Sequence, residues 1–125
     1  AGCLNVTSGT NSTVFNVVPN LPNGAVVNTV RFYYNDTNAS NSTVWFTVHS
    51  LYGEIFNEWQ VSSSGNTGFS FNDTITINHT IDYSIYSYLL NWRPNVTGST
   101  MQMCGIRIFY ESPPFGLSFL PYLER

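Results

Sequence analysis

The stretch 81–110 constrains the fold most, because it holds two long runs in which apolar and polar side chains alternate. Both runs, 81–92 and 101–110, are rich in β-branched and aromatic residues, which favour strands. The segment between them contains the sequence Pro-Asn-x-x-Gly at residues 94–98, which suits a hairpin loop of several residues. The stretch therefore predicts a long antiparallel hairpin at the centre of a sheet.

Alternation continues through the rest of the chain, and no segment has apolar residues at helical spacing over three turns. Strands are expected at 13–18, 26–34, 43–52 and 54–61, with one or two short strands within 69–77. About seven to nine strands with frequent turns indicate an all-β fold, an antiparallel β-sandwich that is jelly-roll-like and has extended terminal segments. The expected parts are an N-terminal extension (1–13), a β-sandwich domain (14–111) and a C-terminal apolar tail (112–125).

Charged residues make up only 9% of the chain, lysine is absent, and the net charge is -3. Nucleic-acid binding needs a basic face, so this composition argues against that class of partner. No run of about 18 apolar residues occurs, and the sequence therefore predicts no transmembrane helix. The chain starts at Ala1 without methionine, which is typical of a mature protein after signal-peptide removal. The expected location is extracellular or on the cell surface.

Cys3 and Cys104 are the two cysteines of the chain. Two cysteines in a secreted chain most often pair, and we expect an intrachain disulfide between them. This bridge would close a loop of about 100 residues and contribute about 4–5 kcal/mol in the chain-entropy model. The alternative is a pair of buried thiols.

The Asn-x-Ser/Thr sequon is the strongest short pattern in the sequence. It occurs eight times, whereas composition alone predicts about three occurrences. The sequence predicts glycans on several of these sites, most of all in the loop expected at 35–43. The alternative is a polar surface whose composition generates sequons without modification. The sequon asparagines are Asn5, Asn11, Asn35, Asn38, Asn41, Asn72, Asn78 and Asn95.

The end of the chain is unusually apolar for a tail. Its large apolar residues are Phe115, Leu117, Phe119, Leu120, Tyr122 and Leu123. Leaving even four of them in water would forgo about 6–12 kcal/mol of burial. Two alternatives follow. The segment is either the final edge strand of its own sandwich, where Pro121 is tolerated, or a strand that docks on another subunit.

Residues with catalytic or ligand chemistry are sparse. Trp45, Trp59 and Trp92 suit either a sugar-stacking platform or core packing, and core packing is favoured. His49 and His79 have no partner at metal-ligand spacing. No paired catalytic carboxylates, nucleophile motif or phosphate loop occurs, so we expect no enzyme, no cofactor and no metal.

Three segments resemble secreted proteins. Residues 119–125, Phe-Leu-Pro-Tyr-Leu-Glu-Arg, are similar to the endings of secreted proteins of filamentous green bacteria. Residues 104–110 resemble the last core strand of uncharacterised bacterial secreted sandwich domains. Residues 117–122 resemble the donor strand of strand-exchange pilins and threads, which are glycosylated extracellular filaments of β-sandwich subunits. The donor strand of that family is usually N-terminal, so a C-terminal one would be a departure.

The sequence thus favours a non-enzymatic structural subunit of an extracellular filament or surface assembly. The expected partners are copies of the chain itself, joined by strand addition, together with surface glycans. Two other classes stay open: a carbohydrate-binding module, and a trimeric jelly-roll head that binds a receptor.

Overall fold

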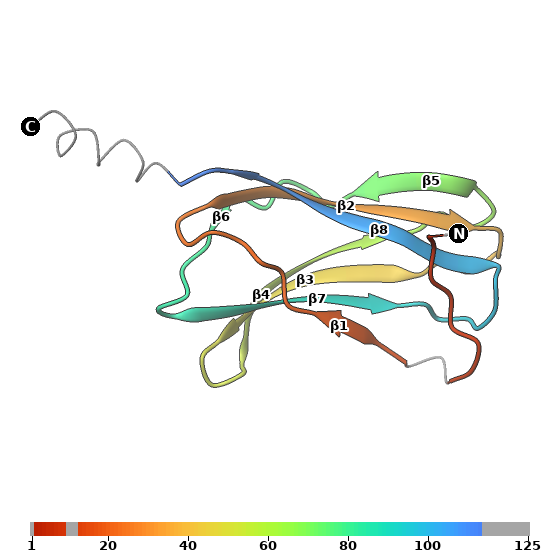
Figure 1. Cartoon of the computed structure of the whole chain (residues 1–125), viewed down its shortest axis with the longest axis horizontal. Helices are drawn as coiled ribbons and strands as arrows, with labels where there is room; N and C mark the ends of the chain where they lie inside the picture. The colour runs from red at the N-terminus through yellow and green to blue at the C-terminus, as the bar shows by residue number, and fades with distance from the viewer. Residues whose placement is uncertain (1, 10–12, 114–125) are drawn as a thin grey trace, which may run out of the picture.

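The computed structural model describes residues 2–9 and 13–113 and forms two antiparallel β-sheets packed face to face (Figure 1). Sheet I has the strand order β1 (Phe15–Val17), β7 (Tyr86–Arg93), β3 (Thr43–Ser50), β4 (Ile55–Ser62). Sheet II contains β2 (Val26–Asp36), β5 (Gly68–Asp73), β6 (His79–Thr80) and β8 (Met101–Glu111). The predicted all-β sandwich is confirmed. The described residues contain no helix long and apolar enough to cross a membrane.

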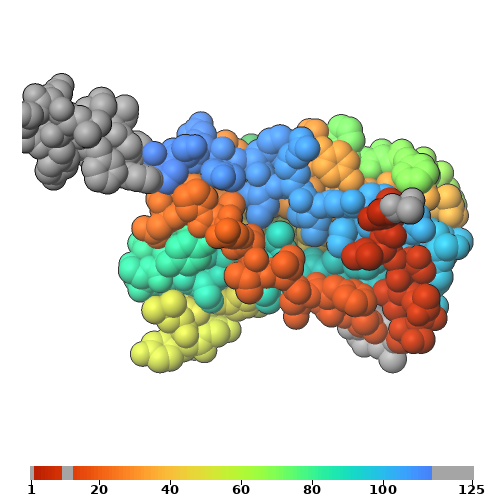
Figure 2. Space-filling view, in the orientation of Figure 1, coloured from red at the N-terminus to blue at the C-terminus, as the bar shows by residue number. Residues whose placement is uncertain are grey.

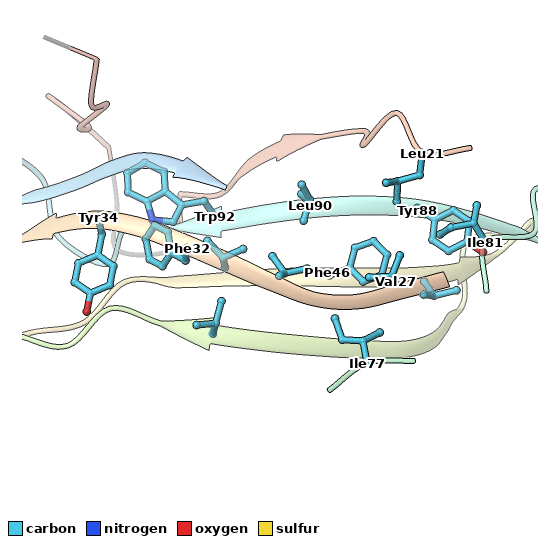
Figure 3. Close-up of a cluster of buried hydrophobic side chains, with 14 of the residues drawn as sticks. Leu21, Val27, Phe32, Tyr34, Phe46, Ile77, Ile81, Tyr88, Leu90 and Trp92 are labelled. Carbon is cyan, nitrogen blue, oxygen red and sulfur yellow. The ribbon is translucent and has the colours of Figure 1, made fainter. Parts of the chain in front are cut away.

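The core lies between the sheets and is built by the alternation in the sequence. On β2, Val30, Phe32 and Tyr34 are buried, and the residues between them face outward. Phe46 of β3 and Trp92 of β7 point toward them from the other sheet (Figure 3). Burying one large apolar side chain contributes about 1.5–3 kcal/mol, so this layer is the main source of stability.

The hairpin predicted over 81–110 is wrong. Strand β7 pairs with β1 and β3 in sheet I, whereas β8 pairs with β2 in sheet II. The link 94–100 therefore crosses from one sheet to the other, a separation of about 10 Å. Alternation reports that each strand buries one face, but it does not report which strand lies beside it. Tyr88, Leu90 and Trp92 of β7 are buried, and Ile106 and Ile108 of β8 pack against the same core, so the two strands meet across the core instead of edge to edge.

The pairing of strands follows the winding of a jelly roll. Strand β7 returns beside β1, β5 returns beside β2, and β4 returns beside β3. A jelly roll has eight long strands in two sheets. Here β5 and the two-residue β6 share one edge of β2, because β8 pairs along the whole opposite edge. Strand β8 thus pairs with β2 on one edge, while on its other edge the described residues contribute only the single pairing of Leu4 with Met103.

The other predicted strands are confirmed with small shifts of their ends. The short strand expected within 69–77 is β5, which ends at Asp73. The polar loop expected from residue 35 begins at residue 37, because β2 continues to Asp36.

Candidate assembly site at the open edge of the sandwich

Residues 2–9 lie beside the first part of β8. Cys3 and Cys104 form a disulfide with an S–S distance of 2.05 Å, which confirms the predicted pairing. Leu4 and Met103 exchange two backbone hydrogen bonds, each 2.8 Å long. Val6 is buried, and its carbonyl accepts a 2.7 Å hydrogen bond from the backbone of Gly98. The segment therefore pairs with β8 only at Leu4 and does not form a full strand.

Beyond Cys104 the outer edge of β8 is open. Within residues 2–9 and 13–113, no strand pairs with this edge from Gly105 to Glu111. On the facing sheet, β1 pairs with β7 on one side and with no described strand on the other. A bare row of backbone N–H and C=O groups is a ready template for another strand.

At the opposite side of the sandwich, β4 pairs only with β3 and β5 only with β2 among the described strands, and side-chain bonds tie these two end strands together. There the chain runs directly from β4 to β5 through residues 63–67. The Nδ2 of Asn72 on β5 donates a 2.8 Å hydrogen bond to the carbonyl of Ser62 on β4 and a 3.1 Å bond to the hydroxyl of Ser64. Residues 63–67 and Asn72 thus tie β4 to β5 across the two sheets, and the candidate site is the other side, between β1 and β8.

An apolar cleft of about 200 Å³ lies between β1 and β8. Its apolar lining consists of Leu4, Phe15, Val17, Leu90, Trp92, Met103 and Ile106, and the polar residues are Asn16 and Asn91. Leu90 and Trp92 belong to the core, so the cleft opens onto the interior of the sandwich. Figure 2 views the molecule from this side, with the N-terminal segment and β1 in red and orange and β8 in blue.

The rim of the cleft exposes large apolar side chains. Leu4 is 61% exposed, Phe15 49% and Val17 56%. Single exposed apolar residues are common on proteins, but these three gather beside an unpaired strand edge. An extended apolar segment laid along β8 would pair with its backbone and cover these side chains in one step.

The residues predicted for self-assembly lie outside the described part of the chain. They are Phe115, Leu117, Phe119, Leu120, Tyr122 and Leu123. The apolar surface between β1 and β8 that these residues could cover was not apparent from the sequence. Leu4 lies in a polar segment, and β1 is only three residues long. The one available signal was the alternation of Phe15 and Val17 in the first expected strand.

The three tryptophans lie at separate places. Trp92 lines the cleft, and Trp59 packs on Phe46 with ring centroids 6.0 Å apart. Trp45 lies on the outer face of sheet I, where the guanidinium of Arg93 sits 5.4 Å from its ring. The described residues therefore do not assemble these rings into one sugar-stacking platform.

His79 lies among aromatic rings at the inner side of sheet I. Its Nε2 is 2.9 Å from the Tyr88 hydroxyl, whose oxygen accepts a 2.9 Å hydrogen bond from the backbone of Asp82. The tautomer of His79 decides which of the two groups donates in the bond between His79 and Tyr88. Burial lowers the pKa of His79, which favours the neutral imidazole. Within the described ranges, no three His, Cys, Asp or Glu side chains form a group that could hold a metal ion.

The sequon asparagines do not gather at one site. Asn11 lies outside the described residues. Asn35 belongs to β2 and Asn72 to β5, while Asn38, Asn41, Asn78 and Asn95 lie in connections and Asn5 in the N-terminal segment. Comparison with known proteins gives no further guide to function: no family model, curated protein or solved structure matches this chain.

Proposed function

We propose that this protein is a non-enzymatic structural subunit of an extracellular filament or surface assembly, and that copies join by strand addition. The acceptor is the outer edge of β8 from Gly105 to Glu111, and the donor is the segment 115–123 of a second copy. One observation supports the proposal most: β8 has no described partner strand along this edge, and an apolar cleft lies beside the edge at Ile106.

The length and chemistry of the donor suit the acceptor. A strand rises about 3.3 Å per residue, so the open edge of seven residues needs about 23 Å of extended chain. The nine residues of 115–123 exceed this length and carry six large apolar side chains. Leu4, Phe15 and Val17 offer apolar surface to cover.

The position of the segment favours a second copy over its own subunit. It follows β8 directly, so pairing with its own β8 would require a tight reversal at residues 112–114. The sequence Pro113-Pro114 favours extended backbone geometry, which disfavours such a reversal. A contact in which one edge receives the tail of the next copy is heterologous, and it yields an open filament unless the rotation closes into a ring.

An extracellular location agrees with the disulfide, because such bonds persist in oxidising compartments. Glycans on the surface would supply the solubility that a chain without lysine and with 9% charged residues lacks. Removing strand-addition contacts should therefore leave a soluble domain.

The test compares the full chain with a chain that ends at residue 113. Electron microscopy and light scattering should find filaments for the full chain and folded monomers for the truncated chain. A synthetic peptide of residues 113–125 should bind the truncated chain, and a peptide of the same composition in scrambled order should not. Filaments of the truncated chain, or its unfolding, would refute strand addition. A closed trimer of the full chain would favour the receptor-binding head.

A further inference from the structure

The sequon asparagines differ in whether the side-chain amide nitrogen, Nδ2, donates a hydrogen bond in the folded chain. Seven of the eight asparagines lie in the described residues, and four of these donate a hydrogen bond through Nδ2. The four donors are Asn35 to Gln102 at 3.1 Å, Asn38 to Thr100 at 3.2 Å, Asn72 to Ser62 at 2.8 Å, and Asn95 to the carbonyl of Asn41 at 2.7 Å. N-glycosylation takes place on this same nitrogen, so these bonds compete with modification.

Asn72 is the clearest structural case. Its Nδ2 donates both of its protons, one to Ser62 and one to Ser64, and these bonds hold β5 to the end of β4. Thr74, the hydroxyl residue of the same sequon, is buried, and its Oγ1 accepts a 3.0 Å hydrogen bond from the backbone of Val30. A glycan at this position would disrupt the hydrogen bonds that tie β5 to the end of β4.

Asn95 also has a structural reason to be asparagine. Its φ is 69°, a left-handed conformation that asparagine tolerates better than most residues. Its amide fixes the connection between β2 and β3 by bonding to the backbone of Asn41. Part of the excess of sequons therefore comes from asparagines that the backbone conformation and hydrogen bonds of the connections require.

Asn41 and Asn78 differ from these four. Both are exposed, and neither side chain makes a hydrogen bond with another described residue. Asn78 lies in the connection between β5 and β6 with φ 53°, and Thr80 of its sequon is exposed as well. Asn5 is half-buried and falls between the two groups.

We propose that Asn41 and Asn78 carry N-linked glycans and that Asn35, Asn38, Asn72 and Asn95 are structural and unmodified. The sugar donor of the glycosylation reaction is an oligosaccharide linked through phosphate to a lipid carrier. A membrane transferase brings it to the asparagine. The Nδ2 of asparagine forms a bond to C1 of the first sugar, and the bond between C1 and the phosphate oxygen breaks. The lipid phosphate leaves with the electron pair, and a base of the transferase takes one amide proton.

This assignment rests on the glycosylation part of the proposed function and is compatible with its assembly part. Asn78 directly precedes β6, which pairs with the edge of β2 that faces away from β8. A glycan there leaves the open edge between β1 and β8 accessible to a donor strand.

The experiment uses the full chain secreted from a glycosylating host, with intact-mass measurement and electron-transfer fragmentation of glycopeptides. Two matched variants each remove one sequon while keeping its asparagine. Thr80→Val and Thr97→Val replace exposed threonines in the sequons of Asn78 and Asn95. We expect Thr80→Val and Asn41→Gln each to lose the mass of one glycan, whereas Thr97→Val should keep the full glycan mass.

A glycan found on Asn72 or Asn95, or a loss of glycan mass in Thr97→Val, overturns the assignment. A secreted chain with the bare polypeptide mass of 14.0 kDa overturns it as well. Electron microscopy of the same preparations separates this failure from that of assembly, because filaments of an unmodified chain would leave strand addition standing.

Discussion

Replacing Cys3 and Cys104 together by serine should lower the free energy of unfolding by about 4–5 kcal/mol. The bridge joins residues separated by 101 positions, and the chain-entropy model assigns about this value to a loop of that length. Few other contacts hold the N-terminal segment: the two backbone bonds of Leu4 and the one of Val6 to Gly98 contribute about 1 kcal/mol each, and burying Val6 adds about 1.5 kcal/mol. The ordering of residues 2–9 offsets much of this, so the segment should detach when the bridge is absent.

Urea unfolding followed by tryptophan fluorescence measures the change. With a urea m-value of about 2 kcal/mol/M, the midpoint should fall by about 2 M. The wild-type chain under reducing conditions is the control and should match the double variant. A fall of less than about 1 kcal/mol in both would show that the bridge does not constrain the unfolded chain, and would refute the reasoning.

Three further predictions concern the core, the turns and pH. Phe46→Ala should cost about 3–5 kcal/mol, because Phe46 is fully buried, whereas Phe69→Ala, at a side chain 76% exposed, should cost less than about 1 kcal/mol in the same urea titration. Gly65→Ala should cost about 1–3 kcal/mol, since its Cβ would lie 2.5 Å from the carbonyl oxygen of Ala39, while Gly2→Ala meets nothing within 4 Å and should be neutral. Because burial lowers the pKa of His79 in the folded chain, the unfolded chain binds the proton more readily, so stability should fall as pH drops below about 6.5 and level off below the folded pKa. Urea midpoints at pH 7.5 and 5.5 should therefore differ in the wild type and differ less in His79→Phe; equal differences would exclude His79 as the cause.

The strands and their buried faces were predictable because alternation is a local property of the sequence. Val30, Phe32 and Tyr34 share a face in any register that buries β2, and the structure buries them as expected. The disulfide was predictable for a similar reason, since two cysteines allow one intrachain pairing.

The arrangement of the strands was not predictable from the same signals. The link 94–100 reads as a hairpin loop, yet it spans the two sheets, because its length permits both connections. The open edge of β8 follows from that arrangement, so no local sequence pattern predicts it. The structural asparagines are similar: Asn72 bonds to Ser62 and Ser64, which lie beside it only after folding.

Hydrogen exchange on a chain ending at residue 113, with and without a peptide of residues 113–125, tests strand addition most directly. Backbone amides that gain a partner strand exchange more slowly. The predicted result is new protection in β8 between Gly105 and Glu111, with the outer edge of β4 (Ile55–Ser62) unchanged as an internal control. Protection confined to β4, or none in β8 at saturating peptide, would contradict the claim that this edge receives the tail of another copy.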